Sequence, residues 1–167
     1  MARRNIVTKE DSILHKKCRP VTKFDGRLHQ LLDDMKETLL LADGVGLAAP
    51  QVGILRRAVL VIETNVDEGE EEYVIELINP EIIETSGEQV GAEGCLSVPG
   101  EYGIVRRPEF VRVRAQDRFG DWHEFEGTGL TARCFCHEID HLDGHLFTEI
   151  CERMLTEEEI NGGEEED

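Results

Sequence analysis

The chain has 167 residues, a formal net charge of −18 and five cysteines. This length suits one domain with a hydrophobic core, and the sequence holds no apolar run long enough to span a membrane. The strong negative charge argues against direct binding to nucleic acid, because phosphates select basic surfaces. No apolar segment follows Arg3 and Arg4, so we expect no secretory signal. The odd cysteine count favours reduced thiols in the cytoplasm over a disulfide framework.

The spacing of apolar residues predicts a first helix over about residues 26–42, with Asp25 as its N-cap and Gly44 at its end. Strands are expected at residues 58–62, 74–78, 81–84, 110–115 and 122–125, with Asn79-Pro80 separating the second from the third. A second helix is predicted from about Thr128 to Leu142. Helices and strands are segregated along the chain, which predicts an α+β fold with antiparallel or mixed β-sheets around this second helix.

The motif HEIDH at residues 137–141 indicates a metal site on that second helix. Residues four apart on a helix lie one above the other, so the imidazoles of His137 and His141 can share one cation. Glu138 is offset from His141 by only about 60° on the helical wheel, so its carboxylate can act on metal-bound water without displacing a ligand. A surface helix with two histidines remains the alternative, because such motifs also arise by chance.

A catalytic metal usually needs a third protein ligand, and the sequence leaves its identity open. Cys95, in the motif EGCLS at residues 93–97, is expected in a loop and would complete a Cys-His-His set. Cys134 projects from the same helical face as His137, so a closed structural site with Cys95, Cys134 and both histidines is the alternative. In that site Glu138 would have no chemical role. Downstream candidates are also present: His145, Glu149 and Cys151.

Three segments in order resemble the three signature motifs of bacterial peptide deformylases: GVGLAAPQ at residues 44–51, EGCLS at residues 93–97 and HEIDH at residues 137–141. The resemblance extends from residue 4 to about residue 147, and PGEYG and VRRP at residues 99–108 match one common branch of the family. It implies an α+β fold whose sheets surround the central helix. It also implies metal-dependent removal of the formyl group from the initiator methionine of new polypeptides, with release of formate.

The same resemblance implies roles for the metal ligands and the base. Cys95, His137 and His141 would bind Fe²⁺ in the cell, and Zn²⁺, Ni²⁺ or Co²⁺ could replace it in preparations. Metal-bound water would be the nucleophile, and Glu138 would act as general base and then general acid. A different thiolate-ligated metallohydrolase, such as a peptidase, is the second hypothesis, and a structural zinc module is the third.

Further roles concern the substrate. The resemblance implies that the Gln51 amide and the Leu96 backbone N–H donate to the oxyanion. Substrate binding is expected to be largely main-chain, because Gly46 allows an extended peptide to pair with the backbone there like an added strand. The resemblance implies that the walls of a methionine pocket include Val45, Glu93 (through its side-chain stem), Leu130, Arg133 and Cys134. For Arg133 we expect the stem to line the pocket while the charge reaches solvent.

Three more positions have open interpretations. Arg107 lies near the substrate path or on the surface, and Asp140 is helix surface or orients a ligand histidine. Cys136 stands where the family commonly has glutamine, and we expect it to be a small buried residue.

The sequence divides into a single catalytic domain at residues 1–150 and a short acidic C-terminal tail at residues 151–167. Residues 67–72 form a second acidic stretch, expected as an exposed loop. The partners implied are N-formylmethionyl nascent peptides. The acidic tail predicts at most weak ribosome association, because ribosomal RNA repels carboxylates. We expect a cytoplasmic monomer without membrane contact.

Overall fold

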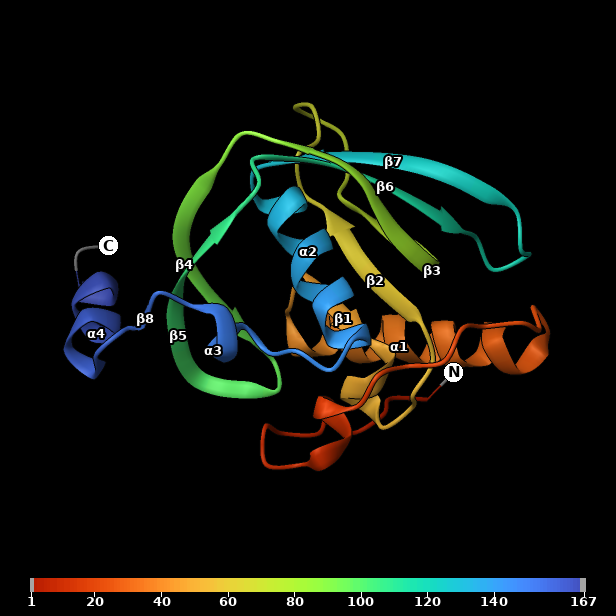
Figure 1. Ribbon diagram of the computed structural model, residues 1–167, viewed down its shortest axis with the longest axis horizontal. Coiled ribbons are helices and arrows are strands. Elements are labelled where there is room, and N and C mark those ends of the chain that lie inside the picture. The colour runs from red at the N-terminus through yellow and green to blue at the C-terminus, as the bar shows by residue number, and fades with distance from the viewer. Residues whose placement is uncertain (1, 166–167) are drawn as a thin grey trace.

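Two antiparallel β-sheets surround one central helix, α2 (Leu130–Leu142), in the computed structural model, which describes residues 2–165 and the side chains of residues 2–161 (Figure 1). The larger sheet has the order β1 (Gly46–Ala48), β2 (Ala58–Glu63), β3 (Tyr73–Ser86), β6 (Phe110–Gln116) and β7 (Trp122–Thr128). The smaller sheet has the order β4 (Gln89–Cys95), β5 (Val98–Arg107) and β8 (Arg153–Met154). The remaining helical segments are η1 (Ser12–His15), α1 (Gly26–Ala42), η2 (Ala49–Val52), α3 (Phe147–Ile150) and α4 (Glu157–Glu165). The predicted α+β class, with sheets around the second helix, is confirmed.

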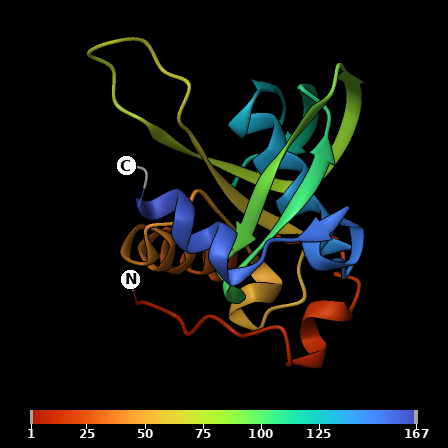
Figure 2. The same cartoon turned by 90° about the vertical axis from the view of Figure 1, so that its left-hand side faces the viewer.

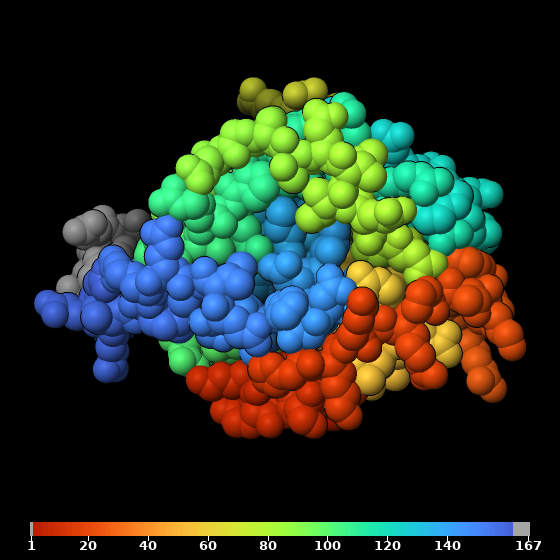
Figure 3. Space-filling model, in the orientation of Figure 1, coloured from red at the N-terminus to blue at the C-terminus, as the bar shows by residue number. Residues whose placement is uncertain are grey.

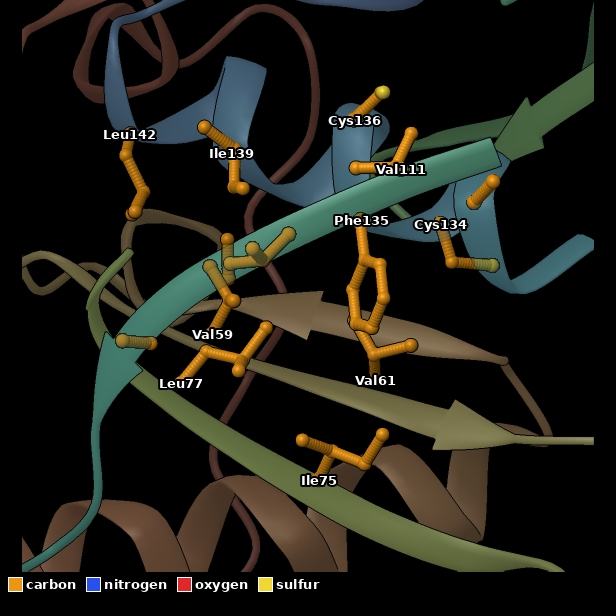
Figure 4. Packing of buried hydrophobic residues seen from close by; sticks show 14 of the residues in the cluster. Val59, Val61, Ile75, Leu77, Val111, Cys134, Phe135, Cys136, Ile139 and Leu142 are labelled. Carbon is orange, nitrogen blue, oxygen red and sulfur yellow. The ribbon is translucent and has the colours of Figure 1, made fainter. Parts of the chain in front are cut away.

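Strand β2 separates the two main parts of the hydrophobic core. Its side chains alternate, so Val59 and Val61 face α2 while Ala58 and Leu60 face α1. Figure 4 shows Phe135 reaching from α2 toward Val61 across this layer. Burial on both faces explains why β2 is apolar throughout and why α2 sits at the centre of the molecule.

Helix α1 begins and ends close to the predicted positions. The side chain of Asp25 accepts a hydrogen bond from the Leu28 N–H at 3.3 Å, as an N-cap does. The helix ends at Asp43, which has a left-handed conformation with φ of 57°, one residue before Gly44. The apolar side of α1 packs against β1 and β2, which places the following residues, 44–48, along the edge of the larger sheet.

The sequence prediction was wrong about two regions of the sheets. Strand β3 is continuous from Tyr73 to Ser86, and Asn79-Pro80 forms an irregularity within it instead of a break. Asn79 has a φ of 52°, and its side-chain amide bonds both the N–H and the carbonyl of Val21. Strands β4 and β5 were not predicted, and Cys95, expected in a loop, is the last residue of β4.

The C-terminal segment continues the smaller sheet before it forms α4. Strand β8 pairs with Gly103 and Ile104 of β5. Thr156 and Glu159 exchange reciprocal hydrogen bonds at 3.1 Å, which form a capping box at the start of α4. The carboxylates predicted as an acidic tail at residues 164–167 lie outside the described side chains, and the domain boundary after residue 150 stays a prediction.

The acidic segment between β2 and β3 projects away from the body of the molecule (Figure 2). Residues 67–72 are exposed there, as expected. Within residues 2–165, no helix is long and apolar enough to cross a membrane.

Asp34 of α1 holds the N-terminal segment against the helix. Its carboxylate accepts hydrogen bonds from the Ala2 N–H at 2.8 Å and from the Arg4 guanidinium, at 3.0 Å from Nη2. The hydrogen bond from Ala2 is the main cause that lowers the pKa of Asp34 below its ordinary value, with Gln30 and Arg4 adding to it against the effect of burial. The stability that this carboxylate provides is therefore present above its unfolded pKa of about 3.9 and lost as the pH falls through its lower folded pKa.

We predict that Asp34→Asn lowers the free energy of unfolding at pH 7 by about 1–2 kcal/mol, because charged hydrogen bonds are lost. The difference from the unmodified chain should begin to shrink below about pH 4, where the carboxylate of the unfolded chain takes up a proton, and should disappear as the pH falls through the lower folded pKa of Asp34. Urea denaturation at several pH values measures both effects. Asp33→Asn is the matched control on the same helix, because the Asp33–Arg118 pair is more exposed and should contribute less than about 1 kcal/mol. A pH-independent difference for Asp34→Asn would contradict this account.

Candidate active site

A cavity of about 420 Å³ brings together the three motifs of the sequence. It lies between the segment that enters β1, the end of β4 with the turn into β5, and α2. All of the site residues predicted from the sequence line it except His141: Val45, Gly46, Gln51, Glu93, Cys95, Leu96, Leu130, Arg133, Cys134, His137 and Glu138. His141 is completely buried beside them.

Three side chains at the inner end of the cavity could hold a metal ion. The ligand atoms of Cys95, His137 and His141 all lie within 4.8 Å of one another, and no other such group occurs among the described residues. Cys95 Sγ is 3.4 Å from His141 Nε2. Cys134 lines the cavity but does not belong to this group, which counts against the closed four-ligand alternative.

The downstream candidates for a third ligand face elsewhere. His145 and Glu149 pair with each other at 3.1 Å, and Cys151 donates to the carbonyl of Thr148. The two histidines of α2 instead meet a thiol that β4 delivers immediately before the two-residue turn of Leu96 and Ser97.

Glu93 is the electrostatic centre of the site. Its carboxylate accepts hydrogen bonds from His137 Nδ1 at 2.6 Å, from two nitrogens of Arg107 at 3.1 and 2.7 Å, and from Arg133 at 2.9 Å. Burial alone would raise the pKa of Glu93, but the bonds from His137 and Arg107 and their charges outweigh it and lower the pKa to about 2. Because Glu93 holds Nδ1 of His137, the Nε2 atom of that ring is left for the metal group.

The contacts around Glu93 show that the prediction for Arg133 was wrong, and they decide between the alternatives left open for Arg107 and Asp140. The charge of Arg133 does not reach solvent: the side chain is buried, and its guanidinium donates to Glu93 and to the carbonyl of Val105. Arg107 is also buried instead of lying on the surface, and it does not line the cavity. Asp140 accepts a hydrogen bond from Arg107 at 2.7 Å, so it acts on the histidine only through Arg107 and Glu93.

Glu138 points its carboxylate into the same buried space. Its Oε1 is buried without a hydrogen-bond partner among the described residues, as is Nδ1 of His141. A Cβ atom on Gly46 would lie 2.5 Å from Glu138 Oε2, so only glycine at position 46 leaves room for this carboxylate. Burial raises the pKa of Glu138 to about 7, although the positive charge of His137 opposes the shift.

Gln51 is held in one orientation by its neighbours. Its Oε1 accepts the Ala48 N–H at 2.9 Å, and its Nε2 donates to Ser97 Oγ at 3.1 Å and toward Cys95 Sγ at 3.5 Å. The amide N–H groups therefore face the end of the cavity that holds the thiol. Ser97 was not predicted as a site residue, although it lies inside the motif EGCLS, two residues after Cys95, and this position indicates that it is close to the site.

A thiolate, two imidazoles and a buried carboxylate beside a cavity are the groups of a metal-dependent hydrolase. The family model described as polypeptide deformylase matches residues 3–156, so the chain belongs to the polypeptide deformylase family. The activity is therefore metal-dependent removal of the N-formyl group from nascent polypeptides.

Individual relatives agree with this assignment. The chain is 56% identical to the peptide deformylase of Caldicellulosiruptor bescii over 160 residues, which cover 96% of this chain and 92% of that protein. It is 50% identical to peptide deformylase 1 of Bacillus subtilis over 160 residues, covering 96% and 97% of the two chains. The crystal structure of a peptide deformylase from Legionella pneumophila superposes with a TM-score of 0.82 at 42% identity, covering 98% of this chain and 92% of that one.

We predict that Glu93→Gln lowers the free energy of unfolding by about 3–5 kcal/mol, because it leaves the buried guanidinium of Arg133 without a charged partner and that of Arg107 with Asp140 alone. Chemical denaturation of the metal-free protein measures this loss. Glu126→Gln is the matched control: Glu126 also accepts from an arginine, Arg112, but the pair is exposed and should be worth less than about 1 kcal/mol. Equal losses in the two variants would refute the central role of Glu93.

Proposed function

We propose that Cys95, His137 and His141 hold Fe²⁺ in the cell, and that Zn²⁺, Ni²⁺ or Co²⁺ replaces it in preparations. The convergence of their three ligand atoms supports this, and sulfur with imidazole nitrogen is a donor set that suits these metals. When bound, the cation would polarise the formyl carbonyl and lower the pKa of a water molecule in the cavity. The hydrogen bond from His137 Nδ1 to Glu93 fixes the ring so that its other nitrogen faces Cys95.

Glu138 acts as the general base and then the general acid. Its unpartnered Oε1 can accept a proton from the attacking water and pass it to the leaving amine of the methionine. The neighbouring Gly46 leaves this carboxylate exposed to the cavity.

The Gln51 amide and the Leu96 backbone N–H stabilise the oxyanion. The orientation of Gln51 supports this role: the Ala48 N–H bonds its carbonyl oxygen, and one amide N–H donates to Ser97 Oγ. The other N–H, which points toward Cys95 Sγ at a distance of 3.5 Å, can then donate to the oxyanion. Leu96 follows Cys95 directly in the turn between β4 and β5, so its backbone is tied to the thiol position.

The methionine side chain occupies the part of the cavity lined by Val45, Glu93, Leu130, Arg133 and Cys134, and the peptide backbone pairs in extended form beside Gly46. Val45 and Leu130 are partly exposed apolar side chains suited to a pocket mouth. Arg133 contributes its aliphatic stem, because Glu93 and the Val105 carbonyl hold its charge.

Residues 1–150 would form a single catalytic domain, since every residue assigned to the site lies within them, and residues 151–167 a short acidic tail. The protein would work as a cytoplasmic monomer on N-formylmethionyl nascent peptides, without binding nucleic acid directly. The net charge of −18 supports only weak, transient ribosome association. Tight ribosome binding that disappeared on deletion of residues 156–167 would contradict this part of the proposal.

We predict that Glu138→Gln retains the metal but lowers formate release from a formyl-Met-Ala-Ser peptide by about 10²-fold to 10⁴-fold, because the proton acceptor is lost. Metal content and turnover of anaerobically purified protein measure the two effects. Cys134→Ser is the control for metal binding, and it should retain the metal, because Cys134 lies outside the group of three ligand atoms. Unchanged turnover in Glu138→Gln, with metal release in Cys134→Ser, would instead favour a structural metal site.

We predict that the iron-loaded enzyme loses activity in air much faster than the nickel-loaded enzyme. A ferrous ion beside the Cys95 thiolate promotes oxidation of that sulfur. Half-lives of the two forms in air measure the difference, and mass spectrometry of the Cys95 peptide locates the damage. Equal half-lives would show that this explanation is wrong.

A further inference from the structure

The N-terminal segment joins the two parts of the site that the sequence keeps far apart. The Val7 N–H donates to the Gln51 carbonyl at 2.8 Å, and the Lys9 N–H donates to the Ser97 carbonyl at 2.9 Å. Gln51 lies in η2, which connects β1 and β2 of the larger sheet, whereas Ser97 lies in the β4–β5 turn of the smaller sheet. Figure 3 shows the N-terminal segment, in red, on the molecular surface.

The spacing of these two bonds constrains the site. Residues 2–8 form no regular strand, and Lys9 begins the turn that the Asp11 N–H closes on the Thr8 carbonyl at 2.9 Å. Only Thr8 separates the two donors, and two residues of chain span at most about 7 Å. Val7 and Lys9 therefore set the separation of the two carbonyls that they bond. Because both acceptors are main-chain atoms, these bonds do not compete with the substrate for the Gln51 side-chain amide.

The segment is attached at both ends. Before it, the Arg4 N–H donates to Thr38 Oγ1 at 2.8 Å, and Ile6 packs against the α1 part of the core. At its other end, the Lys9 ammonium forms an ion pair with Glu101, which lines the cavity. Because the segment is fixed at these points, it can hold η2 and the β4–β5 turn in place relative to each other.

We propose that residues 7–9 are a positioning strap that holds the Gln51 amide and the Leu96–Ser97 turn at the separation needed to stabilise the oxyanion. The inference rests on the oxyanion roles proposed for Gln51 and Leu96. Stabilisation of this kind depends on donors that are already placed where the charge develops, so loosening the strap lowers kcat more than it raises KM. Val7 and Lys9 act through their backbones, as positioning residues.

The chain offers a direct way to remove single backbone N–H groups. Cys18 permits ligation of a synthetic peptide of residues 1–17 to a recombinant fragment of residues 18–167, which restores the native sequence after refolding and metal loading. An ester in place of the amide at Val7 or at Lys9 removes one donor and keeps each side chain. The matched control is an ester at Thr8, whose N–H has no hydrogen-bond partner among the residues described. Lys9→Ala separately removes the ion pair with Glu101 and keeps the N–H.

We expect the Val7 and Lys9 esters each to lower kcat by about threefold to tenfold, the effect of one hydrogen bond, with KM nearly unchanged. The Thr8 ester should behave like the unmodified semisynthetic protein, and Lys9→Ala should keep most of kcat. In the Gln51→Ala background the Val7 ester should have little further effect, because the group that it positions is gone. In metal-free protein, amide hydrogen exchange of residues 96–98 should be faster in the Lys9 ester but not in the Thr8 ester.

Equal kcat values for the Val7, Lys9 and Thr8 esters would contradict the proposed positioning role of residues 7–9. The role would also be contradicted if the Val7 ester lowered kcat by the same factor in the Gln51→Ala variant as in the unmodified chain. These results are distinct from failure of the proposed function. An unmodified semisynthetic protein that folds and binds metal but releases no formate would contradict the function itself, and the strap with it.

Discussion

The buried carboxylate of Glu93 is the interaction on which the rest of this site depends. Taking a carboxylate out of water is costly unless it is paired and hydrogen-bonded, and Glu93 meets this condition through Arg107, Arg133 and His137. These partners lie on β5 and α2, so one charge network ties the smaller sheet to the central helix. Cys95 is two residues away on the same strand, so β4 carries both the thiol of the candidate metal group and the carboxylate that orients His137.

The layered core explains why such a polar site can be buried. Eleven of the 13 residues of α2 are buried, because the larger sheet packs against one side of the helix, β5 packs against another, and Glu93 of β4 bonds two of its side chains. The side chains of β2 point alternately to its two faces, so Val59 and Val61 pack toward α2 while α1 packs against the opposite face (Figure 4). The histidines and Glu138 thus sit in a region of low effective dielectric, where electrostatic interactions with a reacting group are strongest.

The sequence predicted the parts of this arrangement that depend on local spacing. The repeat of His137 and His141 predicts a shared ligand face, and Asp25 predicts a helix start, because both follow from helical geometry alone. Strands with a clear apolar alternation or run, such as β2 and β6, were found for the same reason. The family resemblance supplied the class of reaction, and the comparisons confirmed it.

The features that the sequence did not predict depend on contacts between distant residues. Burial of Arg133 requires Glu93, which lies 40 residues earlier, and no local pattern shows that pairing. Strand β3 stays continuous because Asn79 adopts a left-handed conformation and is bonded by Val21. Strands β4 and β5 contain glycine, and β5 also proline, so their sequences lack the apolar–polar alternation that predicts a strand. They form strands because β4 pairs with β5 and β5 pairs with β8.

The central claim is that one sulfur and two imidazoles from β4 and α2 form the metal centre of a deformylase. X-ray absorption at the metal edge of anaerobically prepared iron-loaded protein tests it most directly, because it counts sulfur and nitrogen ligands. The account predicts one sulfur and two imidazole nitrogens, with the sulfur lost in Cys95→Ala and retained in Cys134→Ala. A spectrum with two sulfur ligands, or one in which the sulfur survives in Cys95→Ala, would contradict it.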